Sequence, residues 1–306
     1  MNWVYVALTS TTLFAIVTVL DKRLIVHHFP SARVFTLAFG LIQAPVALVF
    51  FLIAWAVGVP WEDFSNPAGL AWALASGGLW AVALLLFFYG LALEEVSRAT
   101  PIQMTAPIYA ALVAVLFFGE SLSPAQWAAV LAVVGGAGLV SMRPGQGIFE
   151  VARGRALAVL TGAAMLMGLA HVASKEATDF MAPLPIQGVR AIGMGIGVVA
   201  LIGRGPALRI LMGLARNGAA MRMLVLTEGI MAPLAALLFV VAVSLGPVSV
   251  VSAVTSVRPL VVLALTLVLS KMGSSLLSEP LDRRTVALKT FSTALIVGGV
   301  AALALL

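Results

Sequence analysis

The chain has 306 residues, of which 62% are hydrophobic and only 10% are charged. A soluble domain carries roughly 25% charged residues, so the composition excludes an ordinary water-soluble globule and indicates an integral membrane protein. The absence of cysteine excludes disulfides and thiolate metal sites, and we attribute the net charge of +6 to loops flanking a membrane rather than to nucleic-acid binding.

Apolar runs of about 20 residues, the length that crosses a bilayer, follow one another along the whole chain. Ten can be marked, at 3–20, 34–57, 68–90, 98–118, 124–141, 154–173, 184–203, 221–244, 248–270 and 283–305. They are continuously apolar rather than alternating with a period of two, which predicts helices and not a barrel. The first run lacks a basic flank and a cleavage site, so we interpret it as a retained helix. Ser123 and Gln126 predict a capping box at the start of the fifth helix.

The two halves of the sequence resemble each other. The segment FFYGLALEEVSRATPIQMTAPIYAALVAVLFF, from Phe87, aligns with LFVVAVSLGPVSVVSAVTSVRPLVVLALTLVLS, from Leu238. An offset of 152 places Val96 on Val248, and Pro107 on Pro259. Each half then holds five helices, in residues 1–145 and 153–306. Because five is odd, the second copy must be inverted, so we predict an all-α integral membrane fold of ten transmembrane helices in two inverted five-helix repeats.

These features resemble the EamA-type ten-helix members of the drug/metabolite transporter superfamily. The resemblance rests on VLDKRL, PSARVF, the helix-3/4 run that ends in GESLS, and the glycines of VVGGAGLV, together with their second-half counterparts. It implies secondary transport of small metabolites by alternating access, and we expect a prokaryotic-type plasma membrane. It does not imply a substrate, because the superfamily is chemically broad.

Charge counting predicts the orientation. Fifteen lysines and arginines lie on the side of the loop between helices 1 and 2, whereas the side of both termini carries only Lys175 and Arg190. The positive-inside rule therefore places both termini outside the cytoplasm. This prediction departs from the orientation described for many relatives of the family.

Arg258 lies near the centre of the ninth predicted span. A lone guanidinium there costs about 2.5–3.5 kcal/mol and is tolerated when it faces the interior of the bundle. Pro259 removes a backbone N–H and frees a carbonyl near Thr255, so we predict kinks at Pro259 and at its counterpart Pro107. Two interpretations stay open: Arg258 binds an anionic group of a substrate, or it pairs with Glu228, which we take as the only acid in a span. An alternation between the two would couple protons to transport.

Other polar residues are weaker candidates for substrate contacts. Gln103, Thr105 and Thr255 lie near the predicted kinks, where they could bind a substrate or join helices. His171 could titrate near neutral pH or be a packed, hydrogen-bonded histidine. Trp80 could line a cavity or pack against its neighbours. The sequence indicates no metal site and no cofactor.

The function predicted first is a secondary active transporter of a small polar metabolite, anionic or zwitterionic. The alternative is a non-catalytic membrane subunit or a flippase for a lipid-linked substrate. An enzyme is not expected, because none of the three histidines has an acidic partner in a recognisable motif. The chain lacks a Walker motif, so transport is expected to draw on a gradient or on exchange rather than on ATP. The expected partners are the solute and the lipid bilayer, with protons as a candidate coupling ion. A homodimer could form at the glycines of helices 5 and 10. Substrate, direction, coupling ion and oligomeric state stay open.

Overall fold

The computed structural model describes residues 3–93, 96–141, 154–203, 206–214, 217–271 and 283–305. Every regular element within these ranges is helical, and no strand occurs among them. Nine of the described helical segments are long and apolar enough to cross a membrane. Large apolar side chains such as Trp55, Leu116 and Phe117 are at least 70% exposed on their outer faces, as lipid-facing positions require. The predicted class, an all-α integral membrane protein, is therefore confirmed.

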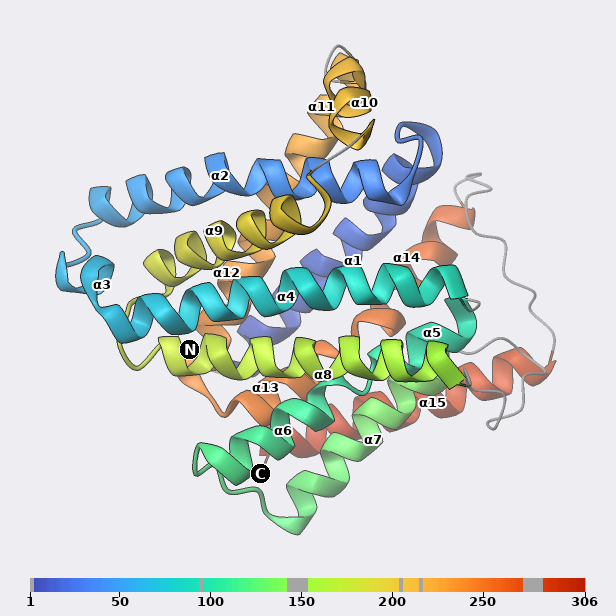
Figure 1. Cartoon of the computed structure of the whole chain (residues 1–306). Coiled ribbons are helices and arrows are strands. Elements are labelled where there is room, and N and C mark those ends of the chain that lie inside the picture. Colours follow the sequence, from blue (N-terminus) through green and yellow to red (C-terminus); the bar gives the residue numbers. More distant parts are fainter. Residues whose placement is uncertain are drawn as a thin grey trace.

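The helices follow the ten predicted apolar runs closely (Figure 1). In the first half they are α1 (Trp3–His27), α2 (Ala32–Ala56), α3 (Glu62–Ser65), α4 (Pro67–Leu93), α5 (Val96–Gln103), α6 (Ala106–Phe117) and α7 (Pro124–Ser141). In the second half they are α8 (Gly154–Ala177), α9 (Pro183–Ile202), α10 (Pro206–Leu214), α11 (Gly218–Leu224), the π-helical segment η1 (Val225–Met231), α12 (Ala232–Leu245), α13 (Val248–Thr255), α14 (Arg258–Lys271) and α15 (Arg283–Leu305). The apolar part of α7, Pro124–Leu139, is shorter than the nine candidate spans.

The helix ends are set by the local chemistry of a few polar residues. Ser123 and Gln126 form the predicted capping box, since each backbone N–H donates to the other side chain, at 2.9 and 3.2 Å. Asn66 Oδ1 accepts from the backbone of Ala68 and Gly69 at the start of α4. The first apolar run stops at residue 20, and VLDKRL was predicted to end the helix, but α1 continues to His27. Asp21 therefore lies inside the helix, six residues before its end.

Two helices are interrupted at corresponding positions. Residues 104–105 separate α5 from α6, and residues 256–257 separate α13 from α14. At each break the backbone makes tighter i→i+3 hydrogen bonds, from Thr105 N to Ile102 O and from Ser256 N to Ala253 O, both at 3.0 Å. Pro107 and Pro259 then occupy the first turn of the new helix, where a missing N–H costs nothing. The breaks lie in the middle of the apolar runs, next to Arg258 in the second half.

Close helix approaches connect the two halves. Helix α9 packs against both α2 and α4, and α4 also packs along α8 (Figure 1). A Cβ added to Gly77 of α4 would overlap the carbonyl oxygen of Arg190 and lie 2.8 Å from Met194 N, so the two backbones touch. At the periphery α7 packs on α15, where a Cβ on Gly136 would lie 2.8 Å from Ile296 Cγ1. Of the glycines predicted in helices 5 and 10, at least Gly136 therefore lies in the contact between α7 and α15.

Two carboxylates of the first half also bind backbone N–H groups of the second half. Asp63 Oδ2 accepts from Ala182 N at 2.9 Å, just before α9 begins. Glu120 Oε1 accepts from Val248 N at 2.7 Å, and its Oε2 accepts from the hydroxyl of Ser249 at 2.6 Å. Glu120 thereby satisfies free N–H groups at the start of α13, in the manner of an N-cap supplied from another part of the chain.

Candidate functional site

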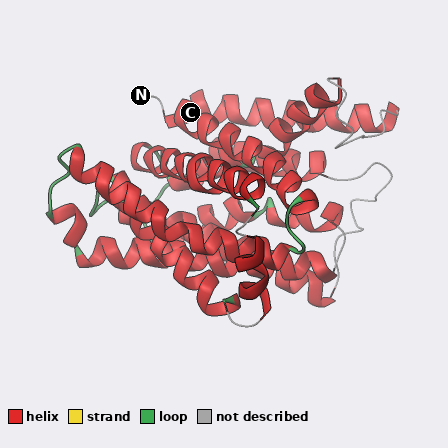
Figure 2. Ribbon diagram, turned by 90° about the horizontal axis from the view of Figure 1, so that it is seen from above, coloured by secondary structure: helices red, strands yellow, loops and turns green. Residues whose placement is uncertain are grey.

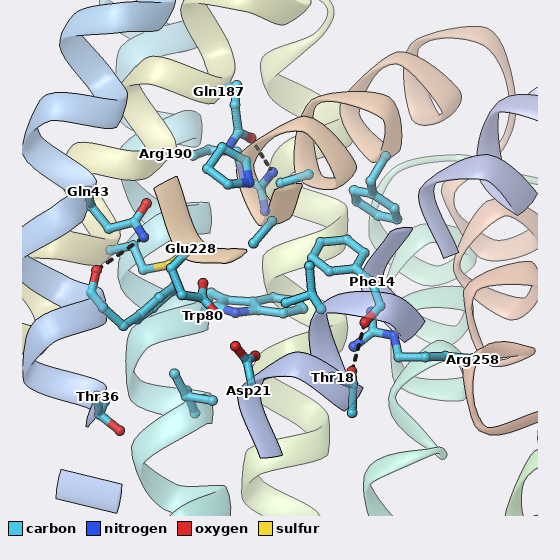
Figure 3. Close-up of a pocket in the computed structure, with 18 of the residues that line it drawn as sticks. Phe14, Thr18, Asp21, Thr36, Gln43, Trp80, Gln187, Arg190, Glu228 and Arg258 are labelled. Carbon is cyan, nitrogen blue, oxygen red and sulfur yellow. Dashed lines mark hydrogen bonds between the residues drawn. The ribbon is translucent and has the colours of Figure 1, made fainter. Parts of the chain in front are cut away.

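A cavity of about 190 Å³ lies between helices of the two halves (Figure 3). Its wall is mostly apolar and aromatic, with a few polar groups, which is the usual make-up of a site for a small solute. The first half contributes Phe14, Val17, Thr18, Asp21, Phe35, Thr36, Phe39, Gln43, Trp80, Leu84 and Phe88. The second half contributes His171, Gln187, Arg190, Met194, Glu228, Ala232, Pro233, Ala236, Phe239, Thr255 and Arg258.

Arg190 is a buried cation held by side chains of two helices. Its Nε donates to Ser76 Oγ of α4 at 3.0 Å, and its Nη1 donates to Gln187 Oε1, one turn earlier in α9, also at 3.0 Å. Ser76 in turn donates to the carbonyl of Ala170 in α8 at 2.8 Å. These two bonds use two of the five N–H donors of the guanidinium, so further donors remain for a solute in the cavity.

Arg258 lies in the cavity wall at the first position of α14, immediately after the helix break. Its guanidinium carbon is 4.6 Å from the ring centroid of Phe14, a cation–π distance. Among the described residues, no ion pair joins Arg258 to Glu228 or to another acid. Arg258 therefore keeps its N–H donors available to the cavity, while the aromatic ring of Phe14 partly compensates its charge.

Asp21 and Glu228 form the acidic part of the cavity. Asp21 lies in α1, Glu228 lies in η1, and their carboxyl groups interact directly and are turned toward one another in Figure 3. Glu228 is 4% exposed, and Asp21 Oδ1 is buried without a hydrogen-bond partner. The cavity thus contains two arginines and two carboxyl groups, a set that can bind both ends of a zwitterion or a single anion.

His171 and Trp80 meet at one wall of the cavity. The two rings stack at 5.6 Å between centroids, and His171 also contacts the ring of Phe239 at 4.5 Å. His171 Nδ1 and Ser252 Oγ share a hydrogen bond of 3.0 Å. His171 is therefore both a packed, hydrogen-bonded histidine and part of the cavity wall. Trp80 likewise packs against its neighbour His171 and lines the cavity.

The remaining predicted site residues divide between the cavity and its surroundings. Thr255 lines the cavity, although its hydroxyl donates to the carbonyl of Ser252 at 2.7 Å. Gln103 and Thr105 are not part of the cavity lining. Thr105 instead donates to the carbonyl of Ile102 at 2.6 Å, beside the break between α5 and α6. Pro107 and Pro259 follow the two breaks. The structure thus brings together Trp80, His171, Glu228, Thr255 and Arg258.

Sequence reasoning missed Asp21 and Arg190. Arg190 was predicted to open its helix and was counted among the cations on the side of the termini, but it is 3% exposed, lies in the eighth position of α9 and lines the cavity. Asp21 belongs to the predicted helix-1 ending VLDKRL but was not considered as an acid in a span; because it lies within α1 and lines the cavity, Glu228 is not the only such acid. The spacing of Gln187 and Arg190, three apart in an otherwise apolar run, was the signal that places both on one helical face.

Metal binding has no visible basis in the described part of the chain. No group of three or more histidine, aspartate and glutamate side chains there is arranged to hold a metal ion. The chemistry of the cavity is instead that of charged hydrogen bonds and aromatic contacts.

Comparison with known proteins finds a family match for the first half of the chain. The sequence profile of the EamA-like transporter family matches residues 1–142. No curated protein sequence matches the chain. One solved structure, described only as "Crystal structure of protein", resembles it with a TM-score of 0.68 over 99% of this chain and 97% of that chain. At 17% sequence identity this likeness shows the fold alone. Residues 1–142 therefore match the EamA-like transporter family, a family of membrane transporters within the drug/metabolite transporter superfamily.

Proposed function

We propose that the protein is a secondary transporter that carries a small anionic or zwitterionic metabolite by alternating access, with the cavity as its solute site. The observation that supports this most is the presence of two guanidinium groups in the wall of one cavity, that of buried Arg190 and that of partly buried Arg258. Cations are costly at this depth and usually mark a solute pathway, and arginine binds carboxylates and phosphates through paired hydrogen bonds. The solute crosses chemically unchanged, so the proposal includes no enzymatic step.

The arrangement of ten helices as two inverted repeats is part of the proposal. The breaks in the α5–α6 and α13–α14 helices differ by 152 residues, the offset of the sequence repeat. Cavity residues recur with the same spacing in both halves: 36, 39 and 43 in α2 against 187, 190 and 194 in α9, and 80, 84 and 88 in α4 against 228, 232 and 236 in η1–α12. The two chain ends lie toward the same side of the molecule in Figures 1 and 2, as an even number of crossings requires. The limits 1–145 and 153–306 lie in residues outside the described ranges and stay a proposal.

Alternating access requires one end of the cavity to be closed when the other is open. The cavity residues of α1, α2 and α4 include Asp21, Thr36 and Phe88, all within seven residues of the helix ends that face the α1–α2 loop. At the opposite end, Asp63 and Glu120 hold the two halves together through their bonds to the backbone. In the proposed cycle these contacts break when the opposite end opens.

Arg258→Ala is expected to remove solute binding and leave the fold intact. Arg258 touches Phe14 and has no ion pair among the described residues, so the truncation disturbs little besides the cavity. Purified protein is screened by thermal unfolding against amino acids and monocarboxylates. A solute at about 100 times its Kd stabilises by about 2.7 kcal/mol, and this stabilisation should disappear in Arg258→Ala.

Arg222→Ala is the matched control, because Arg222 is exposed on α11. It should keep the stabilisation by every solute that binds the wild type. If Arg258→Ala bound the same solutes with unchanged affinity, the cavity would not be the solute site.

The proposed orientation places both termini outside the cytoplasm. Since Arg190 lies in the cavity, the side of the termini keeps only Lys175 of its two cations, against fifteen on the other side, which strengthens the positive-inside argument. A reporter that is active only in the cytoplasm, fused to the C-terminus, should stay inactive, and the same reporter inserted between residues 143 and 153 should be active. The reverse pattern contradicts the orientation without affecting the solute site.

A further inference from the structure

The acidic pair of the cavity joins the two halves of the protein. Asp21 belongs to α1, seven residues after Phe14, and Glu228 belongs to η1, in the second half. The two carboxyl groups interact, and in Figure 3 the carboxyl group of Asp21, below Trp80, is turned toward that of Glu228, which lies beside Trp80. Because each half supplies one carboxyl group, any movement of one half against the other changes the distance between them.

The cavity arginines do not neutralise this pair. Arg190 donates to Ser76 and Gln187, and Arg258 lies over the ring of Phe14. No ion pair with either acid occurs among the described residues, and Asp21 Oδ1 has no hydrogen-bond partner although it is buried. A buried carboxylate without a cation or a donor is costly. The two carboxyl groups therefore lack, within the described part of the chain, a hydrogen-bond donor or a cation that would compensate for their burial.

The described side chains around the two carboxyl groups supply neither a hydrogen-bond donor nor an ion pair, so a proton can take that role. The polar side chains of α2 that line the cavity already donate within their own helix, Thr36 to Ala32 O and Gln43 to Phe39 O. Besides the pair itself, the titratable or charged side chains that line the cavity are His171 of α8, Arg190 of α9 and Arg258 of α14. Lys22 and Arg23 of α1 and Arg222 of α11 are exposed and do not line it. The described residues of α12 and α13 that line the cavity include no titratable or charged side chain.

We propose that Asp21 and Glu228 form a proton-binding site in which the two carboxyl groups share one proton, and that this proton is the coupling ion of transport. A protonated carboxyl group donates one hydrogen bond, which the neighbouring carboxylate accepts, so one proton satisfies both groups at once. The part of the proposal that concerns coupling rests on the transport function proposed above. The proton-binding site itself does not.

Proton loading changes the charge that a solute meets. Two arginines and two carboxylates give the cavity a formal charge of zero, with His171 neutral, and one shared proton raises it to +1. The loaded cavity therefore favours a monoanion, and the unloaded cavity does not. Separation of the halves splits the pair and removes the acceptor for the shared proton, which links release of the proton to the conformational change.

The test measures the proton directly by infrared difference spectroscopy on the purified full-length protein, without any solute. Spectra are recorded from about pH 5 to about pH 8, and the readout is the C=O stretching band of protonated carboxylic acids. The wild type is expected to show a band that disappears as the pH rises. Asp21→Asn and Glu228→Gln should each shift or abolish it, because each removes one partner of the shared proton, and the double variant should lack it.

Two controls keep the result interpretable. Glu62→Gln, at an exposed carboxyl group of α3, should leave the band unchanged. Asp21→Glu and Glu228→Asp retain two carboxyl groups and should retain a pH-dependent band at a shifted position, which shows that a lost band does not come from misfolding.

The proposal is overturned if the double variant keeps the wild-type band. It is equally overturned if one single variant abolishes the band while the other leaves it unchanged, since the proton would then belong to one isolated carboxyl group. Neither result affects the Arg258 experiment, so failure of the proton site and failure of the solute site are distinguishable.

Discussion

Arg190→Ala is expected to lower the free energy of unfolding by about 3 kcal/mol and to abolish solute binding. The substitution removes two charged hydrogen bonds and leaves the Oε1 atom of buried Gln187 without its donor, whereas Ser76 keeps its bond to Ala170 O. Hydrogen bonds to charged groups contribute about 1.5–3 kcal/mol each, and an unsatisfied buried partner adds to the loss. Thermal and denaturant unfolding in detergent measure the stability, and solute stabilisation measures binding.

Arg190→Lys separates the two effects of this residue. Lysine keeps the positive charge but cannot donate from one planar group to Ser76 and Gln187 and also to a solute. We expect Arg190→Lys to recover part of the stability while solute binding stays at least about tenfold weaker, which corresponds to about 1.4 kcal/mol. Wild-type binding in Arg190→Lys would show that charge alone, and not the guanidinium, is required.

Gly77→Ala is expected to destabilise the protein by about 3 kcal/mol, although it adds a single methyl group. The added Cβ would overlap the carbonyl oxygen of Arg190 and lie 2.8 Å from Met194 N. Backbone atoms cannot move aside as a side chain does, so α4 and α9 must separate, and overpacking typically costs 1–3 kcal/mol or more. The separation also moves Arg190 out of the cavity wall, so solute binding should fall with stability.

The neighbouring glycine provides the control for this effect. A Cβ on Gly78 would meet nothing within 4 Å, and alanine is a better helix former than glycine by about 1 kcal/mol. Gly78→Ala should therefore leave the unfolding temperature unchanged or raise it. Equal destabilisation by both substitutions would indicate that the contact between α4 and α9 is not what limits stability.

The positions of the helices could be predicted well from the sequence, because the length of each apolar run indicates where a helix crosses the membrane. Nine candidate spans of the structure and α7 coincide with the ten apolar runs, with ends that differ mostly by one to four residues. The largest difference is at α1, where the apolar run stops at Leu20 but the helix continues through Asp21 and Lys22 to His27. Charged residues end an apolar run, but they do not end a helix whose hydrogen bonds and buried face continue.

The candidate site was less predictable, because its polar residues come from both halves. Arg258 and Glu228 stand out in the sequence, since each interrupts an apolar run near its centre. Arg190 lies only eight residues into α9 and therefore looked like a residue at the membrane surface. Which acid meets which base depends on helix rotation and packing, and the sequence gives neither. Glu228 accordingly faces Asp21 rather than forming an ion pair with Arg258 among the described residues.

The bonds from Asp63 and Glu120 to the second half also have an evolutionary consequence. Both carboxylates accept from main-chain N–H groups, at positions 182 and 248. On the side of the N–H donor the contact does not depend on the identity of the residue, so drift there is harmless unless it introduces proline, which has no N–H. On the side of the acceptor the residue must have a side-chain oxygen at a suitable distance. The two partners of each contact are therefore under unequal selection, and a pairwise search for covarying positions would overlook both contacts.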